Sequence, residues 1–144
     1  MKIRFVTTRM AGFAALTLFA ATTAPAAENP LGEREYQTRC AMCHGVAGRG
    51  DGWLSENLLQ HPPSLRQLKK NNGGVFPFAS VNQVIDGRKA VKLHGPRVMP
   101  VWGTVYSVEQ QMANAARSGV SSADEKLVRA KIRALTNYVS QLQD

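Results

Sequence analysis

"CAMCHG", residues 40–45, contains both cysteines of this 144-residue chain, and a histidine directly follows the second of them. Two thiols three residues apart with an adjacent imidazole fit three kinds of chemistry. They suit a dithiol–disulfide redox pair, part of a zinc site, or the covalent attachment point of a c-type haem. Because these chemistries make different demands on the rest of the chain, the remaining sequence can distinguish them.

Residues 1–26 have the composition of a secretory signal peptide. Three basic residues precede an apolar run at residues 10–21, and Ala24 and Ala26 supply the small side chains expected before a cleavage after Ala26. An uncleaved membrane anchor would need about 20 apolar residues, more than this run provides. We therefore expect Sec-type export to the periplasm, no stable membrane insertion after cleavage, and a single mature domain at residues 27–144.

The composition is ordinary for a globular protein, with 44% hydrophobic and 19% charged residues. Without residues 1–26 the chain keeps 15 Lys and Arg against 10 Asp and Glu, a net charge of about +5. Such a charge favours partner proteins with acidic surfaces. Basic and aromatic residues are not interleaved as in nucleic-acid-binding proteins, so we expect no nucleic-acid partner.

Helical signals mark both ends of the mature chain. Asn29 and Pro30 read as the N-cap and first residue of a helix over residues 30–40, with Glu33 and Glu35 near its positive dipole end. The last helix is predicted from a capping box of Ser122 and Glu125 and from apolar residues at helical spacing. These are Val128, Ile132, Leu135, Val139 and Leu142, widened by Ala134 and Tyr138.

Shorter helices are expected between these two, separated by long loops. They lie at residues 64–70, at 80–85 with Ser80 as cap and Gly87 as terminator, and at 107–118. Residues 94–103, "HGPRVMPVWG", contain two prolines and two glycines, which argue against a regular helix there. The sequence thus predicts an all-α protein whose loops are too long for so small a core, unless an apolar cofactor completes that core.

The position of the two cysteines favours haem over the alternatives. A redox dithiol needs its first cysteine at a helix start, whereas Cys40 ends the first predicted helix. A zinc site would need a fourth ligand from His61 or His94. Haem c uses every element of the stretch, because Cys40 and Cys43 can add to its two vinyl groups while His44 binds the iron.

A second iron ligand is expected from a downstream loop. Met99 is the best candidate, because it lies in a proline- and glycine-rich apolar loop. His94 is the alternative and would give a bis-histidine iron. Met112 is interpreted as core filler in a helix, and Trp102 as packing either near the haem edge or in the protein core.

Three motifs in this order resemble the class I cytochrome c family, specifically its small bacterial periplasmic members. They are "CAMCHGVAGRGDG" at residues 40–52, "HPPSL" at 61–65 and "VMPVWG" at 98–103. The resemblance implies a class I fold of about four to five helices and long loops around one covalently bound haem c. It also implies that the carbonyl of Pro63, or less well of Pro62, receives the N–H of His44. A fourth feature also carries the resemblance, because Gly32 and Tyr36 with Leu135 and Tyr138 match the family's contact between the first and last helices.

The function that the resemblance implies is one-electron transport, not enzymatic catalysis. Two alternatives remain open: a cytochrome subunit bound to a periplasmic dehydrogenase or reductase, and a small peroxidase-like haem enzyme in which Met99 leaves the iron. A basic stretch before Met99 has no counterpart in a specific subfamily. Its cations, together with two lysines of the predicted helix at residues 64–70, would surround an exposed haem edge with positive charge. These residues are Lys69, Lys70, Arg88, Lys89, Lys92 and Arg97.

Overall fold

The computed structural model describes residues 29–87, 99–114 and 121–144, and within these ranges the chain forms helices and loops with no strand. The all-α prediction is therefore confirmed. The expected signal peptide, His94 and the basic residues Arg88, Lys89, Lys92 and Arg97 lie outside the described ranges. None of the described helices is both long enough and apolar enough to span a membrane. The elements are α1 (Pro30–Arg39), α2 (Ala41–His44), η1 (Ser55–Asn57), η2 (Leu65–Gln67), α3 (Leu68–Asn71), α4 (Phe78–Asp86), α5 (Trp102–Ala113) and α6 (Ser122–Gln141).

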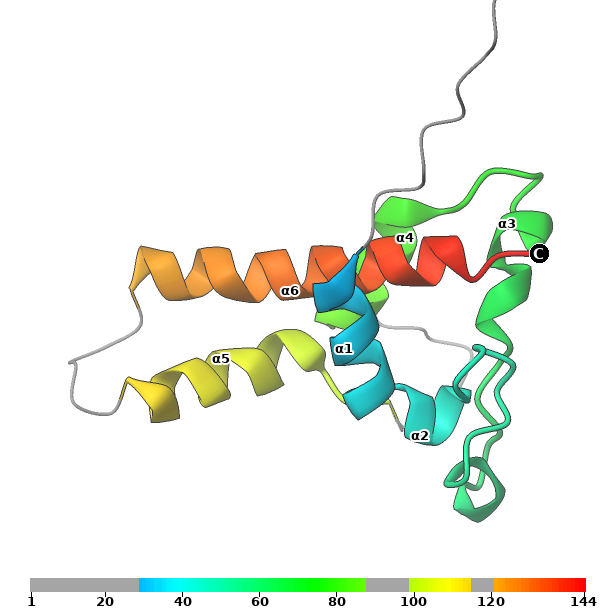
Figure 1. Cartoon of the computed structure of the whole chain (residues 1–144), viewed down its shortest axis with the longest axis horizontal. Helices are drawn as coiled ribbons and strands as arrows, with labels where there is room; N and C mark the ends of the chain where they lie inside the picture. The colour runs from blue at the N-terminus through cyan, green and yellow to red at the C-terminus, as the bar shows by residue number, and fades with distance from the viewer. Residues whose placement is uncertain (1–28, 88–98, 115–120) are drawn as a thin grey trace, which may run out of the picture.

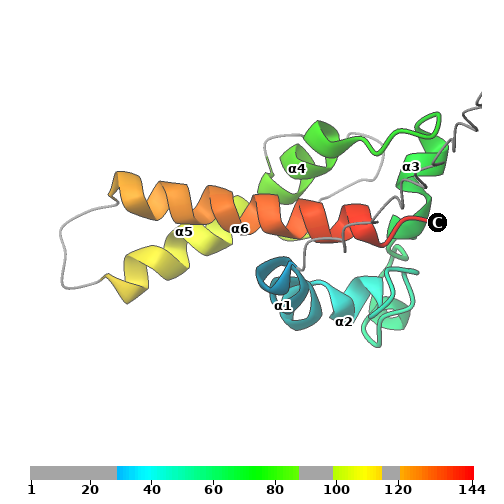
Figure 2. The ribbon, with the colours of Figure 1, turned by 45° about the horizontal axis from the view of Figure 1, so that its top comes forward.

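Helix α6 is the scaffold on which the other long helices pack. Figure 1 shows it extending across the molecule, with α1 crossing it near its middle and α5 lying alongside its N-terminal half. The turned view in Figure 2 places α4 on the opposite side of α6 from α1. The apolar stripe predicted for α6 is buried, at Val128, Ile132, Leu135 and Val139. Tyr36 of α1 and Tyr106 of α5 are fully buried in the same core.

The crossing of α1 over α6 is close because Gly32 has no side chain. A Cβ atom at Gly32 would lie 2.8 Å from the main-chain carbonyl carbon of Ala134 and still closer to its oxygen. Asn29 caps α1 by accepting from the Gly32 N–H at 3.1 Å, and its amide also donates to the Ala134 carbonyl at 2.7 Å. Tyr36 packs on Tyr138 with ring centroids 5.1 Å apart. The predicted contact between the two helices is present, with Ala134 rather than Leu135 opposite Gly32.

The start of α6 differs from the prediction by one residue. The capping box consists of Ser121 and Asp124, and the Ser121 hydroxyl accepts from the Asp124 N–H at 3.2 Å. The Asp124 carboxylate accepts from the Ser121 N–H at 2.9 Å. The predicted box of Ser122 and Glu125 is therefore wrong, because the neighbouring serine and acid fill the same roles one position earlier.

Helix α5 starts five residues before the predicted Ser107. Trp102 and Gly103 are helical, so the expectation that residues 94–103 exclude a helix is wrong at its C-terminal end. The reason is tertiary: a Cβ at Gly103 would lie 2.6 Å from the main-chain oxygen of Asp86, so glycine allows α5 to begin directly against the end of α4. Packing here outweighs the low helix propensity of glycine.

The remaining helices are close to their predicted ranges. Helix α4 begins at Phe78 rather than after a Ser80 cap, and it ends as predicted before Gly87, whose φ of 93° is left-handed. The segment predicted at residues 64–70 is a 3₁₀ turn followed by one turn of α-helix. The turn α2, which follows α1, was not predicted as a separate helix.

Candidate functional site

The two cysteines and His44 lie on one tight turn. Helix α1 ends at Arg39, and the carbonyl of Cys40 then accepts from the N–H groups of Cys43 at 3.1 Å and His44 at 2.8 Å. Both cysteines are free thiols of intermediate exposure. The structure thus brings together the three residues that the motif singles out, and it places them at the end of the helix that crosses α6.

The glycine-rich loop after His44 folds back onto this turn. The N–H groups of Gly50, Gly52 and Leu54 donate to main-chain carbonyls of the turn, at 2.8, 3.2 and 2.9 Å respectively. The Tyr36 hydroxyl donates to the Gly45 carbonyl at 2.8 Å, which ties the loop to α1. These bonds pair main-chain groups of the loop with main-chain groups of the turn. They therefore hold the backbone of the turn that carries the thiols and the imidazole.

The imidazole of His44 is held in its neutral form. Burial lowers its pKa, and the main chain of Pro63 acts in the opposite direction, which locates Pro63 beside the ring. The Nδ1 atom of His44 is buried and has no hydrogen bond of normal geometry among the described residues. A neutral imidazole has a free lone pair, as a metal ligand requires. The structure therefore brings the predicted pair, His44 and Pro63, close together.

The cysteine environment differs from that of a reactive thiol. Burial, with a further contribution from the charge of Glu35, raises the pKa of Cys40 to about 12. Redox-active dithiols depend on the opposite shift, because the thiolate is the reacting species. Among the residues that the structure describes, no group of three or more His, Cys, Asp and Glu side chains could hold a metal ion. The donor set of two free thiols and one adjacent, buried imidazole fits haem c.

The two predicted residues from the distal segment lie against the core. Met99 is partly buried and packs on the core cluster, as does Trp102, the first residue of α5. The Trp102 ring lies 5.9 Å from that of Tyr106, and the guanidinium of Arg39 lies 5.9 Å from the Trp102 ring centre. Trp102 thus packs on Tyr106 of its own helix and on Arg39 of α1. Met112, which was expected to fill the core, is 72% exposed.

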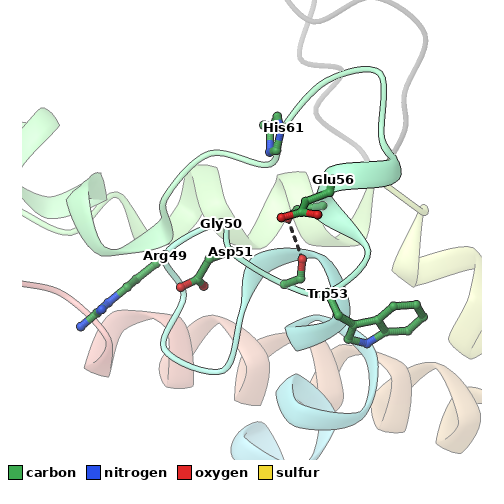
Figure 3. A pocket seen from close by; sticks show the side chains of 8 residues that line it. Arg49, Gly50, Asp51, Trp53, Glu56 and His61 are labelled. Atoms are coloured by element: carbon green, nitrogen blue, oxygen red, sulfur yellow. Dashed lines mark hydrogen bonds between the residues drawn. The ribbon is translucent and has the colours of Figure 1, made fainter.

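A shallow hollow of about 540 Å³ lies beside the loop that follows the cysteine turn. Figure 3 shows its polar rim and the exposed indole of Trp53. It contains none of the predicted haem-binding residues. His61, the possible zinc ligand, is one of its lining residues and is exposed. The full lining is Arg49, Gly50, Asp51, Gly52, Trp53, Ser55, Glu56 and His61.

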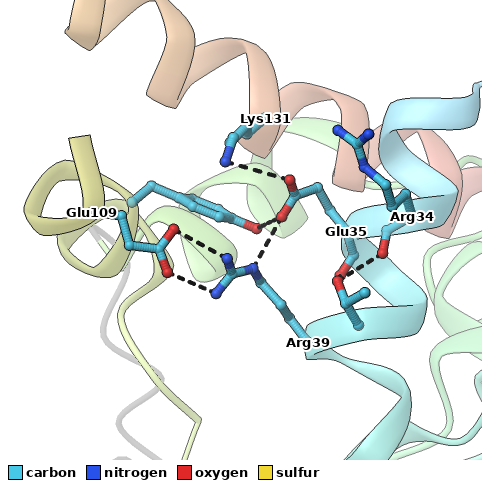
Figure 4. Close-up of polar contacts among 7 residues, drawn as sticks. Arg34, Glu35, Arg39, Glu109 and Lys131 are labelled. Carbon is cyan, nitrogen blue, oxygen red and sulfur yellow. Dashed lines mark hydrogen bonds and ion pairs between the residues drawn. The ribbon is translucent and has the colours of Figure 1, made fainter. Parts of the chain in front are cut away.

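A cluster of charged side chains at the junction of α1, α5 and α6 was not predicted from the sequence. Its centre is Glu35, which is only 5% exposed and was expected merely to favour the helix dipole. The carboxylate accepts from Tyr106 at 2.9 Å and pairs with Arg39 at 3.1 Å and Lys131 at 3.4 Å (Figure 4). Spacing along the chain indicates only the i,i+4 pair of Glu35 and Arg39, because the other members come from α5 and α6.

The helical fold and the cysteine turn define a monohaem c-type cytochrome. The chain belongs to the family described as "Cytochrome C oxidase, cbb3-type, subunit III", whose model matches residues 27–117. Neither the comparison with curated proteins nor that with solved structures gave a match. Membership of this family implies haem binding and haem-based electron transfer. The match ends before α6, the helix on which α1 packs.

Proposed function

We propose that the protein is a periplasmic one-electron carrier with one haem c, attached through Cys40 and Cys43 and held by His44 and Met99. The observation that carries this proposal is the turn at the end of α1, which brings the two free thiols of Cys40 and Cys43 together with the imidazole of His44. Residues 1–26, with the pattern of a Sec-type signal peptide, support export. Covalent haem attachment normally accompanies export of a CxxCH protein, so the two parts of the proposal agree.

Each residue of the proposed haem site has a specific role. Haem c supplies a one-electron ferrous–ferric couple when bound. His44 would hold the iron through its imidazole, and the Pro63 carbonyl would orient that ring by accepting the Nδ1–H. Met99 would supply a thioether ligand, which favours the ferrous state relative to a second imidazole and so would raise the reduction potential. With both ligands supplied by the protein, electron transfer would not require a substrate to bind the iron.

The absorption spectrum of the purified ferric protein tests the ligand pair. Sulphur ligation by Met99 gives a charge-transfer band, which the Met99→Ala variant should lose while gaining a site open to added ligands. The matched control is Met112→Ala, which removes an exposed methionine and should leave the band unchanged. A low-spin spectrum without the band would indicate that His94, and not Met99, is the second iron ligand.

Carbon monoxide distinguishes the carrier from a haem enzyme. Because a carrier keeps both axial ligands, the unmutated ferrous protein should bind carbon monoxide poorly and the Met99→Ala variant readily. Ready binding by the unmutated protein would support instead the peroxidase-like reading, in which Met99 leaves the iron.

Partners with acidic docking surfaces follow from the net positive charge of the mature chain and from Lys69 and Lys70, which are exposed on α3. Electrostatic steering of this kind accelerates short-lived encounters and is screened by salt. The rate of electron transfer to an acidic redox partner should therefore fall as ionic strength rises. A flat or rising dependence would argue against acidic partners.

A second candidate is a subunit permanently bound to a larger oxidoreductase. It is favoured by the description of the matching family, which names an oxidase subunit. Affinity purification of the tagged protein from its native periplasmic and membrane fractions separates the two. A free carrier should elute alone, whereas a subunit should elute with stoichiometric partner chains.

A further inference from the structure

The position of α5 determines where Met99 can lie, because α5 begins only three residues after it. Three residues of α5 share one face, at positions 103, 106 and 109. Gly103 contacts the end of α4 through the main chain of Asp86. The other two face α1, where Tyr106 donates to Glu35 and Glu109 pairs with Arg39. Helix α5 is thus fixed at successive turns along this face.

Arg39 makes the strongest of these connections. Its guanidinium donates two hydrogen bonds to the Glu109 carboxylate, at 2.8 and 3.1 Å, and a third to Glu35 at 3.1 Å. It also lies 5.3 Å from the ring centre of Tyr106 and 5.9 Å from that of Trp102. A bidentate, partly buried arginine pair of this geometry holds two elements more rigidly than an exposed ion pair does.

The location of Arg39 in the chain links the two halves of the site. It is the last residue of α1 and directly precedes Cys40. Its partners Trp102 and Glu109 belong to the helix that follows Met99. One side chain therefore joins the segment that carries the cysteines and His44 to the segment that carries the second predicted ligand. Lys131 completes the charge balance by pairing with Glu35 from α6.

We propose that Arg39 is a positioning residue that holds α5, and with it Met99, in place against the helix leading into the cysteine turn. This inference rests on the proposed role of Met99 as an iron ligand. Loss of the Arg39–Glu109 pair would let the start of α5 move away from α1, so that Met99 leaves the iron more often. The main-chain hydrogen bonds that shape the cysteine turn would remain, because they do not involve Arg39.

Imidazole binding to the ferric holoprotein measures this directly, since added imidazole binds only when Met99 is displaced. The Arg39→Gln and Glu109→Gln variants should each bind imidazole about tenfold more tightly, the effect of losing one charge-assisted pair. The double variant should add little to either single change. Arg39→Lys, which keeps the charge but loses the bidentate geometry, should lie between Arg39→Gln and the unmutated protein.

The matched control is Glu125→Gln, which breaks an exposed i,i+4 pair with Arg129 on α6. It should leave imidazole affinity unchanged. If Arg39→Gln does not fold, Glu109→Gln decides alone. The Glu109 side chain is 37% exposed, and after its replacement Arg39 still pairs with Glu35.

The results separate this inference from the proposed function. Unchanged imidazole affinity in the Arg39→Gln and Glu109→Gln variants, even with reduced thermal stability, would show that the pair is only structural and would overturn the inference. If the unmutated protein has the sulphur-to-iron band in that case, the proposed ligation stands. If the unmutated protein lacks the band, the proposed ligation by Met99 and this inference are overturned together.

Discussion

Replacing Gly32 by alanine tests the backbone contact between α1 and α6. In an isolated helix the change would gain about 1 kcal/mol of helix propensity. Here the new Cβ would lie 2.8 Å from the Ala134 carbonyl carbon, and main-chain atoms cannot move aside by rotamer change. Overpacking of this kind costs about 1–3 kcal/mol, and the 2.7 Å bond from Asn29 to the same carbonyl would lose about 1 kcal/mol more.

The expected result for Gly32→Ala is a net loss of about 2 kcal/mol in the free energy of unfolding. For a domain of this size that corresponds to a fall in Tm of about 8 °C. Denaturant and thermal unfolding of the holoprotein, followed by far-UV circular dichroism, measure both quantities. Arg34→Ala, at an exposed position of the same helix, is the matched control and should change stability by less than about 0.5 kcal/mol.

Two results would contradict this prediction. A Gly32→Ala variant at least as stable as the unmutated protein would mean that helix propensity dominates and that the backbones are not in contact. Rescue by Ala134→Gly would also contradict it. The clash is with the main-chain carbonyl of residue 134, so removing the Ala134 side chain should not relieve it.

Further predictions concern a cap, a buried hydroxyl and the buried acid. Ser121→Ala should cost about 1 kcal/mol of unfolding free energy and Ser122→Ala much less; equal losses in urea unfolding would contradict the assigned capping box. Tyr36→Phe leaves the Gly45 carbonyl without its buried donor and should cost about 1–3 kcal/mol, whereas an unchanged urea midpoint would contradict this. The pKa of Glu35 is lowered overall. Burial by itself would raise this pKa, but the hydrogen bond from Tyr106 and the charges of Lys131 and Arg39 outweigh burial. Glu35 should therefore stabilise the fold above its unfolded pKa of about 4.3 and lose this contribution as pH falls through the lower folded value. The stability difference between the unmutated protein and Glu35→Gln should shrink over that range, and a constant difference would refute it.

The parts of the fold that could be predicted are those governed by local rules. Asn29 and Pro30 start α1 because an N-cap side chain and a fixed φ act within one turn. The buried stripe of α6 follows from apolar spacing, which needs no knowledge of the partner helix. The turn at residues 40–44 was recognised because its chemistry lies within five consecutive residues.

The helix boundaries were predicted wrongly where two capping boxes are equally compatible with the sequence, or where tertiary packing determines where a helix begins. Ser121 with Asp124 and Ser122 with Glu125 are equally good capping boxes, so the sequence does not determine which one forms. Gly103 reads locally as a helix breaker, yet it is required in α5 by the approach of the α4 main chain. Only the three-dimensional arrangement supplies that information.

The candidate site divides in the same way. Cys40, Cys43 and His44 are adjacent in sequence, and the structure finds them on one turn. Pro63 lies 19 residues further along the chain and could be placed beside His44 only through the family resemblance. Arg39 and Glu109 were missed altogether, because a salt bridge between residues 70 apart leaves no periodic signal.

The mass of the denatured protein decides whether haem is attached covalently through Cys40 and Cys43. The protein is expressed with its own residues 1–26 in a host that matures c-type cytochromes, purified, and measured by mass spectrometry under denaturing conditions. We expect the mass of residues 27–144 plus one haem, and the haem-free mass for the variant that combines Cys40→Ala with Cys43→Ala. A haem-free mass for the unmutated protein, with haem released on denaturation, would contradict covalent attachment through the cysteine turn.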